Sequence, residues 1–107
     1  MIDWERIEQL ERDFGTECLT EVIHMFFSEA EEVIAPLRRG DARRDLRSDM
    51  HFLKGSALNL GFRQLASLCS EAEQLAARGR RSEVGIAEIL GAYDAARGAI
   101  LNRKPAA

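Results

Sequence analysis

Apolar residues recur every three or four positions along nearly the whole chain, the spacing that one face of an α-helix requires. A first, short stripe stops at Gly15, and a second runs from Thr16 to Leu37. Pro36 removes a backbone donor near the end of the second helix, which predicts a kink or fraying there. The two stripes consist of Ile2, Ile7, Leu10 and Phe14, then Leu19, Val22, Ile23, Phe26, Ala30, Val33, Ile34 and Leu37.

Three more helices are predicted in the second half of the chain. Gly40 is a stop signal, Asp41 a predicted N-cap for the third helix, and Gly61 its end. The fourth helix ends near Gly79, and Ser82 is the predicted cap of the last one. The inward-facing residues are Leu46, Met50, Leu53, Ala57 and Leu60; Leu65, Leu68, Cys69, Ala72, Leu75 and Ala76; and Ile86, Leu90, Tyr93, Ile100 and Leu101.

Four substantial helices with short connections favour one all-α fold. The expected arrangement is an antiparallel up-and-down four-helix bundle, with the N-terminal segment as a short capping helix. The 107 residues suit a single domain, which we expect over residues 1–104, with a loose tail at 105–107.

The composition narrows the class of protein. Hydrophobic residues make up 46% and charged residues 31% of the chain, which is typical of a folded soluble protein. No apolar run approaches the roughly 18 residues of a membrane span, and the charged N-terminus does not resemble a secretory signal. We therefore expect a cytoplasmic location and no membrane contact. Cys18 and Cys69 have no metal-site spacing and are expected to be buried, reduced thiols.

The net charge of −3 is unevenly distributed. Residues 1–32 carry ten acids against two arginines, whereas residues 33–63 carry seven basic residues against three acids. The sequence pI of about 5.4 argues against a general nucleic-acid binder. A local basic stretch in an acidic protein instead indicates a face that meets an acidic partner.

One histidine has unusual surroundings. On a helical wheel His51 lies about 140° from the core stripe and points outward, with Arg47 and Lys54 one turn to either side and Gly55 four residues on. Imidazole is a nucleophile, and a phosphoryl group on it would carry nearly two negative charges for Lys54 and Arg47 to bind. Gly55 would let a partner approach closely. A surface histidine among basic residues is, however, most often simply solvated, as we expect for His24.

Residues 51–61 read His-Phe-Leu-Lys-Gly-Ser-Ala-Leu-Asn-Leu-Gly. This string closely resembles the signature of histidine-containing phosphotransfer (HPt) domains, the modules of bacterial, fungal and plant phosphorelays. The signature is met by His51, Lys54, Gly55, Ser56, Asn59, Leu60 and Gly61. The resemblance extends to residues 40–41 and 65–69 and to the long helix that carries Phe26 and Phe27.

The resemblance implies a specific function. His51 would accept a phosphoryl group from the aspartyl-phosphate of a receiver domain, or from a kinase, and pass it to another receiver. Lys54, aided by Arg47, would stabilise the phosphoryl group, and Gly55 would give clearance. The expected partners are response-regulator receiver domains or a hybrid histidine kinase, and we expect a monomer. The chain would bind no ATP and no cofactor, since the Mg²⁺ belongs to the receiver.

Related domains often place a glutamine of the following helix against the histidine ring. Counting across the Gly61 turn puts Glu73 opposite His51. We expect Glu73 to accept the Nδ1 proton and leave the Nε2 lone pair free, although a solvated glutamate is an equally good interpretation.

The docking surface is expected around His51. Leu58 lies outside the core stripe and is the first candidate for an exposed apolar contact, while Phe62, Phe27 and Phe14 are weaker ones that could equally complete the core. Arg44 would join Arg47 and Lys54 in steering an acidic receiver.

Three alternatives remain at this stage. The phosphoacceptor domain of a histidine kinase would need an acid and an Arg-Thr-Pro-Leu type sequence after its histidine, and a nucleotide-binding domain. A non-catalytic helical adaptor would need neither His51 nor Lys54. An ordinary enzyme would need a pocket-forming loop, a metal cluster or a phosphate-binding glycine loop.

Overall fold

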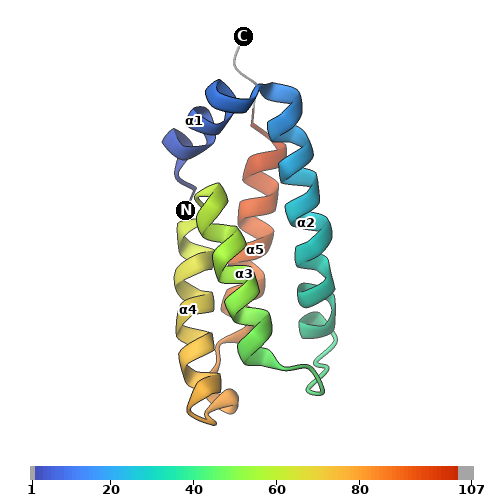
Figure 1. The fold of residues 1–107 in the computed structure, drawn as a ribbon. Helices are drawn as coiled ribbons and strands as arrows, with labels where there is room; N and C mark the ends of the chain where they lie inside the picture. The colour runs from blue at the N-terminus through green and yellow to red at the C-terminus, as the bar shows by residue number, and fades with distance from the viewer. Residues whose placement is uncertain (1, 104–107) are drawn as a thin grey trace.

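The computed structural model describes residues 2–103 and is built from five α-helices. In chain order they are α1 (Trp4–Phe14), α2 (Thr16–Arg38), α3 (Leu46–Leu60), α4 (Arg63–Ala77) and α5 (Ile86–Leu101), with a 3₁₀ turn, η1 (Arg81–Glu83), before α5. Helices α2 to α5 lie alongside one another, and α1 lies across the end where α2 begins (Figure 1). The all-α prediction is therefore confirmed. The expected domain end at 104 and the tail at 105–107 lie outside the described residues.

Most helix limits follow from local signals in the sequence. Gly15 separates α1 from α2, and Gly61 ends α3 with φ of 79°, in the left-handed region that glycine adopts without strain. Helix α2 continues through the buried Pro36 to Arg38.

Two predicted caps are wrong. Asp41 does not begin α3: its carboxylate accepts from the backbone N–H of Arg43 within a turn. The N-cap is Asp45, which accepts from the Ser48 N–H at 3.2 Å. Ser82 lies inside η1, and α5 starts after Gly85 without a side-chain cap.

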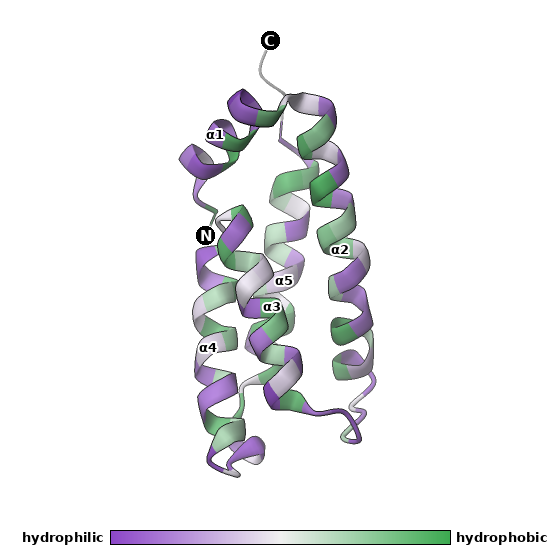
Figure 2. Ribbon diagram, in the orientation of Figure 1, coloured by the Kyte–Doolittle hydropathy of each residue, from purple (hydrophilic) through white to green (hydrophobic). Residues whose placement is uncertain are grey.

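The core lies between the helices and contains a cluster of aromatic side chains. The Phe26 ring meets Phe27 at 5.0 Å and Phe62 at 5.2 Å between centroids, and Phe27 also meets Tyr93 at 5.8 Å. These are mostly edge-to-face contacts, which stabilise beyond simple burial. Apolar and polar residues alternate around each helix (Figure 2), as the amphipathic pattern predicts.

The burial of several predicted core and surface residues differs from expectation. Phe62 is fully buried at the start of α4, where it completes the aromatic cluster and its backbone pairs with Ile2, so it is not a docking residue. Phe27 is buried as well. Cys18 is exposed rather than buried, because its side of α2 faces an open groove. Val22 and Leu101 are also exposed.

Candidate functional site

Helix α3 presents His51 to solvent. Its side chain is 70% exposed, whereas Met50 and Leu53 on the opposite side of the helix are completely buried. The outward position predicted from the periodicity is therefore correct.

Helix α3 packs more extensively against α4 than any other pair of helices does, and this contact brings Glu73 to His51. One carboxylate oxygen, Oε2, lies 2.9 Å from Nδ1 of His51. The other, Oε1, accepts a hydrogen bond from Nζ of Lys54 at 2.6 Å. The contact predicted by counting residues is thus present, and one carboxylate bridges the histidine and the lysine.

The electrostatics of this bridge follow from the groups involved. The hydrogen bond from Lys54, and then that from His51, lower the pKa of Glu73. Glu73 is therefore ionised near neutral pH and can only accept hydrogen bonds, so Nδ1 of the ring is the donor. In the neutral ring Nε2 then keeps its lone pair, and it is free to act as a nucleophile.

The sequence did not predict that the ammonium group of Lys54 would be hydrogen-bonded within the protein. Its side chain is only 27% exposed, and Glu73, 19% exposed, holds it in the seam between α3 and α4. Sequence spacing placed Lys54 one turn from His51 and Glu73 opposite His51, but the contact between Lys54 and Glu73 depends on how closely the two helices pack.

Gly55 and Arg47 flank the histidine. A Cβ atom added to Gly55 would meet no atom within 4 Å, so the helix surface beside His51 is open. Arg47 lies in a shallow hollow that is lined by Asp45, Arg47, Ser48, His51, Phe52 and Glu73. Within residues 2–103 we find no ion pair that engages the Arg47 side chain, which leaves its charge available at the surface.

The other predicted docking residues differ in how freely a partner could contact them. Leu58 is 59% exposed, one turn beyond Lys54. Arg44, in the segment before α3, is held by two hydrogen bonds to Asp49, each 2.9 Å, so its charge is partly offset by a neighbouring carboxylate. Phe52, partly exposed in the His51 hollow, was not singled out from the sequence; its position next to His51 was the available signal.

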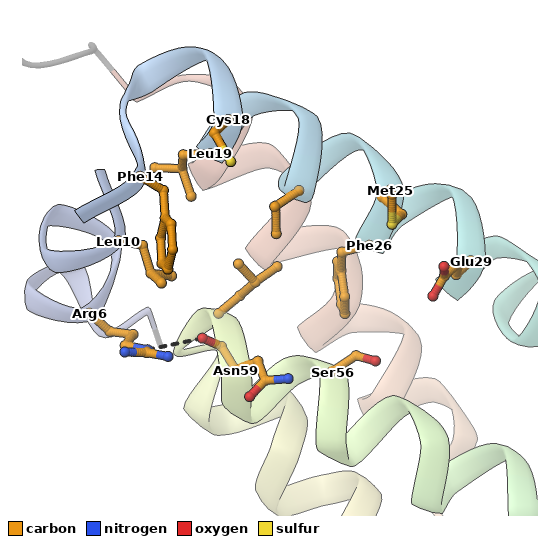
Figure 3. A pocket seen from close by; sticks show the side chains of 12 residues that line it. Arg6, Leu10, Phe14, Cys18, Leu19, Met25, Phe26, Glu29, Ser56 and Asn59 are labelled. Atoms are coloured by element: carbon orange, nitrogen blue, oxygen red, sulfur yellow. Dashed lines mark hydrogen bonds between the residues drawn. The ribbon is translucent and has the colours of Figure 1, made fainter. Parts of the chain in front are cut away.

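A separate apolar groove of about 450 Å³ lies between α1, α2 and the end of α3. In Figure 3, Leu10 and Phe14 of α1 and Phe26 of α2 line it, and a hydrogen bond from Arg6 to the backbone carbonyl of Asn59 bounds it. The exposed Phe14 belongs to this groove rather than to the His51 hollow.

Among residues 2–103 no three side chains of histidine, cysteine, aspartate or glutamate come together in a way that could hold a metal ion. In the same part of the chain, no helix combines the length and apolar character needed to cross a bilayer.

Comparisons with known proteins agree with the geometry. The sequence model of the Hpt domain matches residues 21–99, which include α3, α4, His51, Lys54 and Glu73. No curated protein and no solved structure gives a significant match. The family match covers well over half of the chain, and it spans the one exposed histidine whose ring is held by a neighbouring helix. The chain belongs to the Hpt domain family, whose general role is histidine phosphotransfer in two-component phosphorelays.

Proposed function

We propose that this chain is a phosphorelay intermediate that carries the phosphoryl group on His51. It accepts the group from the aspartyl-phosphate of a receiver domain, or from a kinase, and passes it to the aspartate of another receiver. The observation that carries the proposal is the exposed His51 ring, whose Nδ1 is bound by Glu73 at 2.9 Å while Nε2 is left open.

The transfer step needs a nucleophile, a leaving group and charge neutralisation. The Nε2 lone pair attacks phosphorus, and the phosphorus–oxygen bond to the donor breaks, with its electrons returning to the receiver carboxylate. Lys54 and Arg47 offset the charge of the phosphoryl oxygens. The receiver supplies Mg²⁺, and this chain contributes no cofactor.

Several surface residues support docking of a receiver. Gly55 leaves the helix surface open beside His51, and Leu58 offers an apolar contact one turn further along. Arg47 steers the acidic active site of the receiver, so association weakens as salt rises. Arg44 contributes less, because Asp49 partly offsets its charge.

The four long helices form an antiparallel up-and-down bundle with α1 as its cap, and the single domain extends over residues 1–104. The protein acts as a cytoplasmic monomer, and hybrid kinases and receivers are its partners.

The test is to mix the protein with a phosphorylated receiver domain and Mg²⁺. An acid-labile, alkali-stable phosphoryl label should appear on the wild type and on His24→Gln, but not on His51→Gln. A label that persists in His51→Gln would refute the assignment. A wild type that binds receivers but never takes up label would instead be a non-catalytic helical adaptor.

A further inference from the structure

Glu73 lies against the ring nitrogen that does not take the phosphoryl group, which makes it a determinant of the phosphorylated state. Resting on the function proposed above, we propose that Glu73 keeps Nδ1 of phosphorylated His51 protonated and offsets the charge of Lys54. The phosphoryl group is then held weakly and released readily. Glu73 is a positioning residue in this proposal, because it acts through His51 and Lys54 and does not touch the phosphoryl group.

The proton on Nδ1 matters because it decides what leaves when the nitrogen–phosphorus bond breaks. The electron pair of that bond returns to Nε2. With Nδ1 protonated, the departing group is a neutral imidazole, whereas without that proton it would be an imidazolate anion. A neutral imidazole is by far the better leaving group, so the protonated phosphohistidine is the more reactive donor.

The contacts around His51 hold a proton on Nδ1. The Glu73 carboxylate lies 2.9 Å from Nδ1 and is mostly shielded from solvent by the α3–α4 interface. The other charged groups of the hollow are Asp45 and Arg47. Asp45 is bound to the N–H and hydroxyl of Ser48, and Arg47 is exposed, so neither counteracts a carboxylate in direct contact with the ring.

The contact with Lys54 acts in the same direction. The 2.6 Å hydrogen bond pairs the ammonium group with Glu73, so a phosphoryl group on Nε2 meets a cation whose charge is already largely offset. The negative charge of Glu73 also repels the phosphoryl oxygens, because only the imidazole ring separates the two groups. An amide at this position would have neither effect.

The complete step requires no movement of a proton. A carboxylate oxygen of the receiver attacks phosphorus, the nitrogen–phosphorus bond breaks, and its electrons return to Nε2, while the Nδ1 proton stays between the ring and Glu73. The product is the neutral Nδ1–H ring that is ready to accept again. This arrangement suits a carrier that exchanges phosphoryl groups quickly rather than one that stores them.

The experiment uses phosphoramidate, a small phosphoryl donor, so that no partner protein is needed. Wild type, Glu73→Gln and the control Glu71→Gln are phosphorylated, freed of donor, and followed by ³¹P NMR from about pH 5 to pH 9. Glu71→Gln also removes one negative charge from α4, but from an exposed residue that lines a different hollow. Circular dichroism melts verify that all three proteins are folded.

We expect phosphorylated Glu73→Gln to outlast the wild type about tenfold at neutral pH, because a contact with one opposite charge shifts a titration by about one unit or more. The pH at which loss of the phosphoryl group is half-maximal should fall by a similar amount, and Glu71→Gln should follow the wild type. Superimposable pH profiles for wild type and Glu73→Gln would overturn the inference while leaving the carrier function intact. Failure of wild-type His51 to hold any phosphoryl group would instead overturn the proposed function, and this inference with it.

Discussion

The backbone N–H of Asp3 donates to the carbonyl of Gly61 at 2.7 Å, so the start of the chain is fastened to the turn that ends α3. A Cβ atom on Gly61 would lie 3.0 Å from Cβ of Asp3 and 3.2 Å from that of Arg6. The last glycine of the phosphotransfer signature is therefore a packing position as well as a turn.

This contact predicts the stability of two alanine variants. The free energy of unfolding of Gly61→Ala should be lower by about 1–2 kcal/mol, because alanine is strained at a positive φ. It should fall by a further amount because α1 must move away from the added methyl group. Gly40→Ala shares the positive φ of 70° but meets nothing within 4 Å, so it should lose the backbone contribution alone. Urea unfolding measures both. Equal losses would show that the Asp3 contact contributes nothing.

Substitutions of Gly55 should affect the stability of the fold and the rate of phosphoryl transfer in opposite directions. It lies exposed in the middle of a helix with open space around it, so Gly55→Ala should stabilise the fold by about 1 kcal/mol. Gly55→Gln should slow transfer from a receiver at least tenfold, because its side chain would occupy the surface beside His51.

Gly91 in α5 supplies the matched control for Gly55. It is also exposed, helical and free of neighbours within 4 Å. Gly91→Ala should stabilise the fold to a similar extent, and Gly91→Gln should transfer at the wild-type rate. Normal transfer by Gly55→Gln would exclude a clearance role.

Lys54 is expected to matter for chemistry more than for folding. Lys54→Ala should slow transfer roughly ten- to a hundredfold, which corresponds to about 1.4–2.7 kcal/mol of barrier. Single-turnover transfer of a radioactive phosphoryl group gives the rate. Arg80→Ala removes a positive charge far along the chain at the α4–η1 turn and should leave the rate unchanged. A wild-type rate for Lys54→Ala would mean that Lys54 does not contact the phosphoryl group.

Asp45 makes the fold sensitive to acid. Hydrogen bonds from the backbone N–H and hydroxyl of Ser48 hold its pKa below the ordinary 3.8. Because the carboxylate is more acidic in the folded chain, its stabilising effect is present above about pH 4 and is lost as the pH falls further.

Asp45→Asn tests this dependence, since asparagine caps helices about as well as aspartate but does not titrate. The variant should melt near the wild-type temperature at pH 7. Below about pH 4 its melting temperature should fall less steeply than that of the wild type. If the melting temperatures of the two proteins changed in parallel over the whole pH range, the Asp45 carboxylate would have the same acidity in the folded and unfolded chain.

The sequence predicted the helices and the position of the histidine better than it predicted the contacts between helices. The periodicity placed His51 opposite the core, and Gly61 marked the end of α3, because both depend on local geometry. The position of Glu73 opposite His51 could be predicted by counting residues across one tight turn. The Lys54–Glu73 hydrogen bond could not, because it depends on the separation of α3 and α4.

The errors have the same origin. Asp41 and Asp45 are both capable N-caps, and only the turn formed by residues 41–45 decides between them. Phe62 was a weaker docking candidate that could equally complete the core, and it is buried against Phe26 and Phe27 of α2. Cys18 and Val22 lie in an apolar-periodic segment, but they line the open groove that α2 forms with α1 and the end of α3, so they stay exposed.

The central claim is that His51 both takes up a phosphoryl group and gives it away. The protein should be loaded from a labelled receiver, purified, and mixed with a second, unphosphorylated receiver and Mg²⁺. The account predicts that label leaves His51 and appears on the receiver aspartate, from which it is then lost as inorganic phosphate. Label that remains on His51 in the presence of every receiver that donates to it would contradict the account.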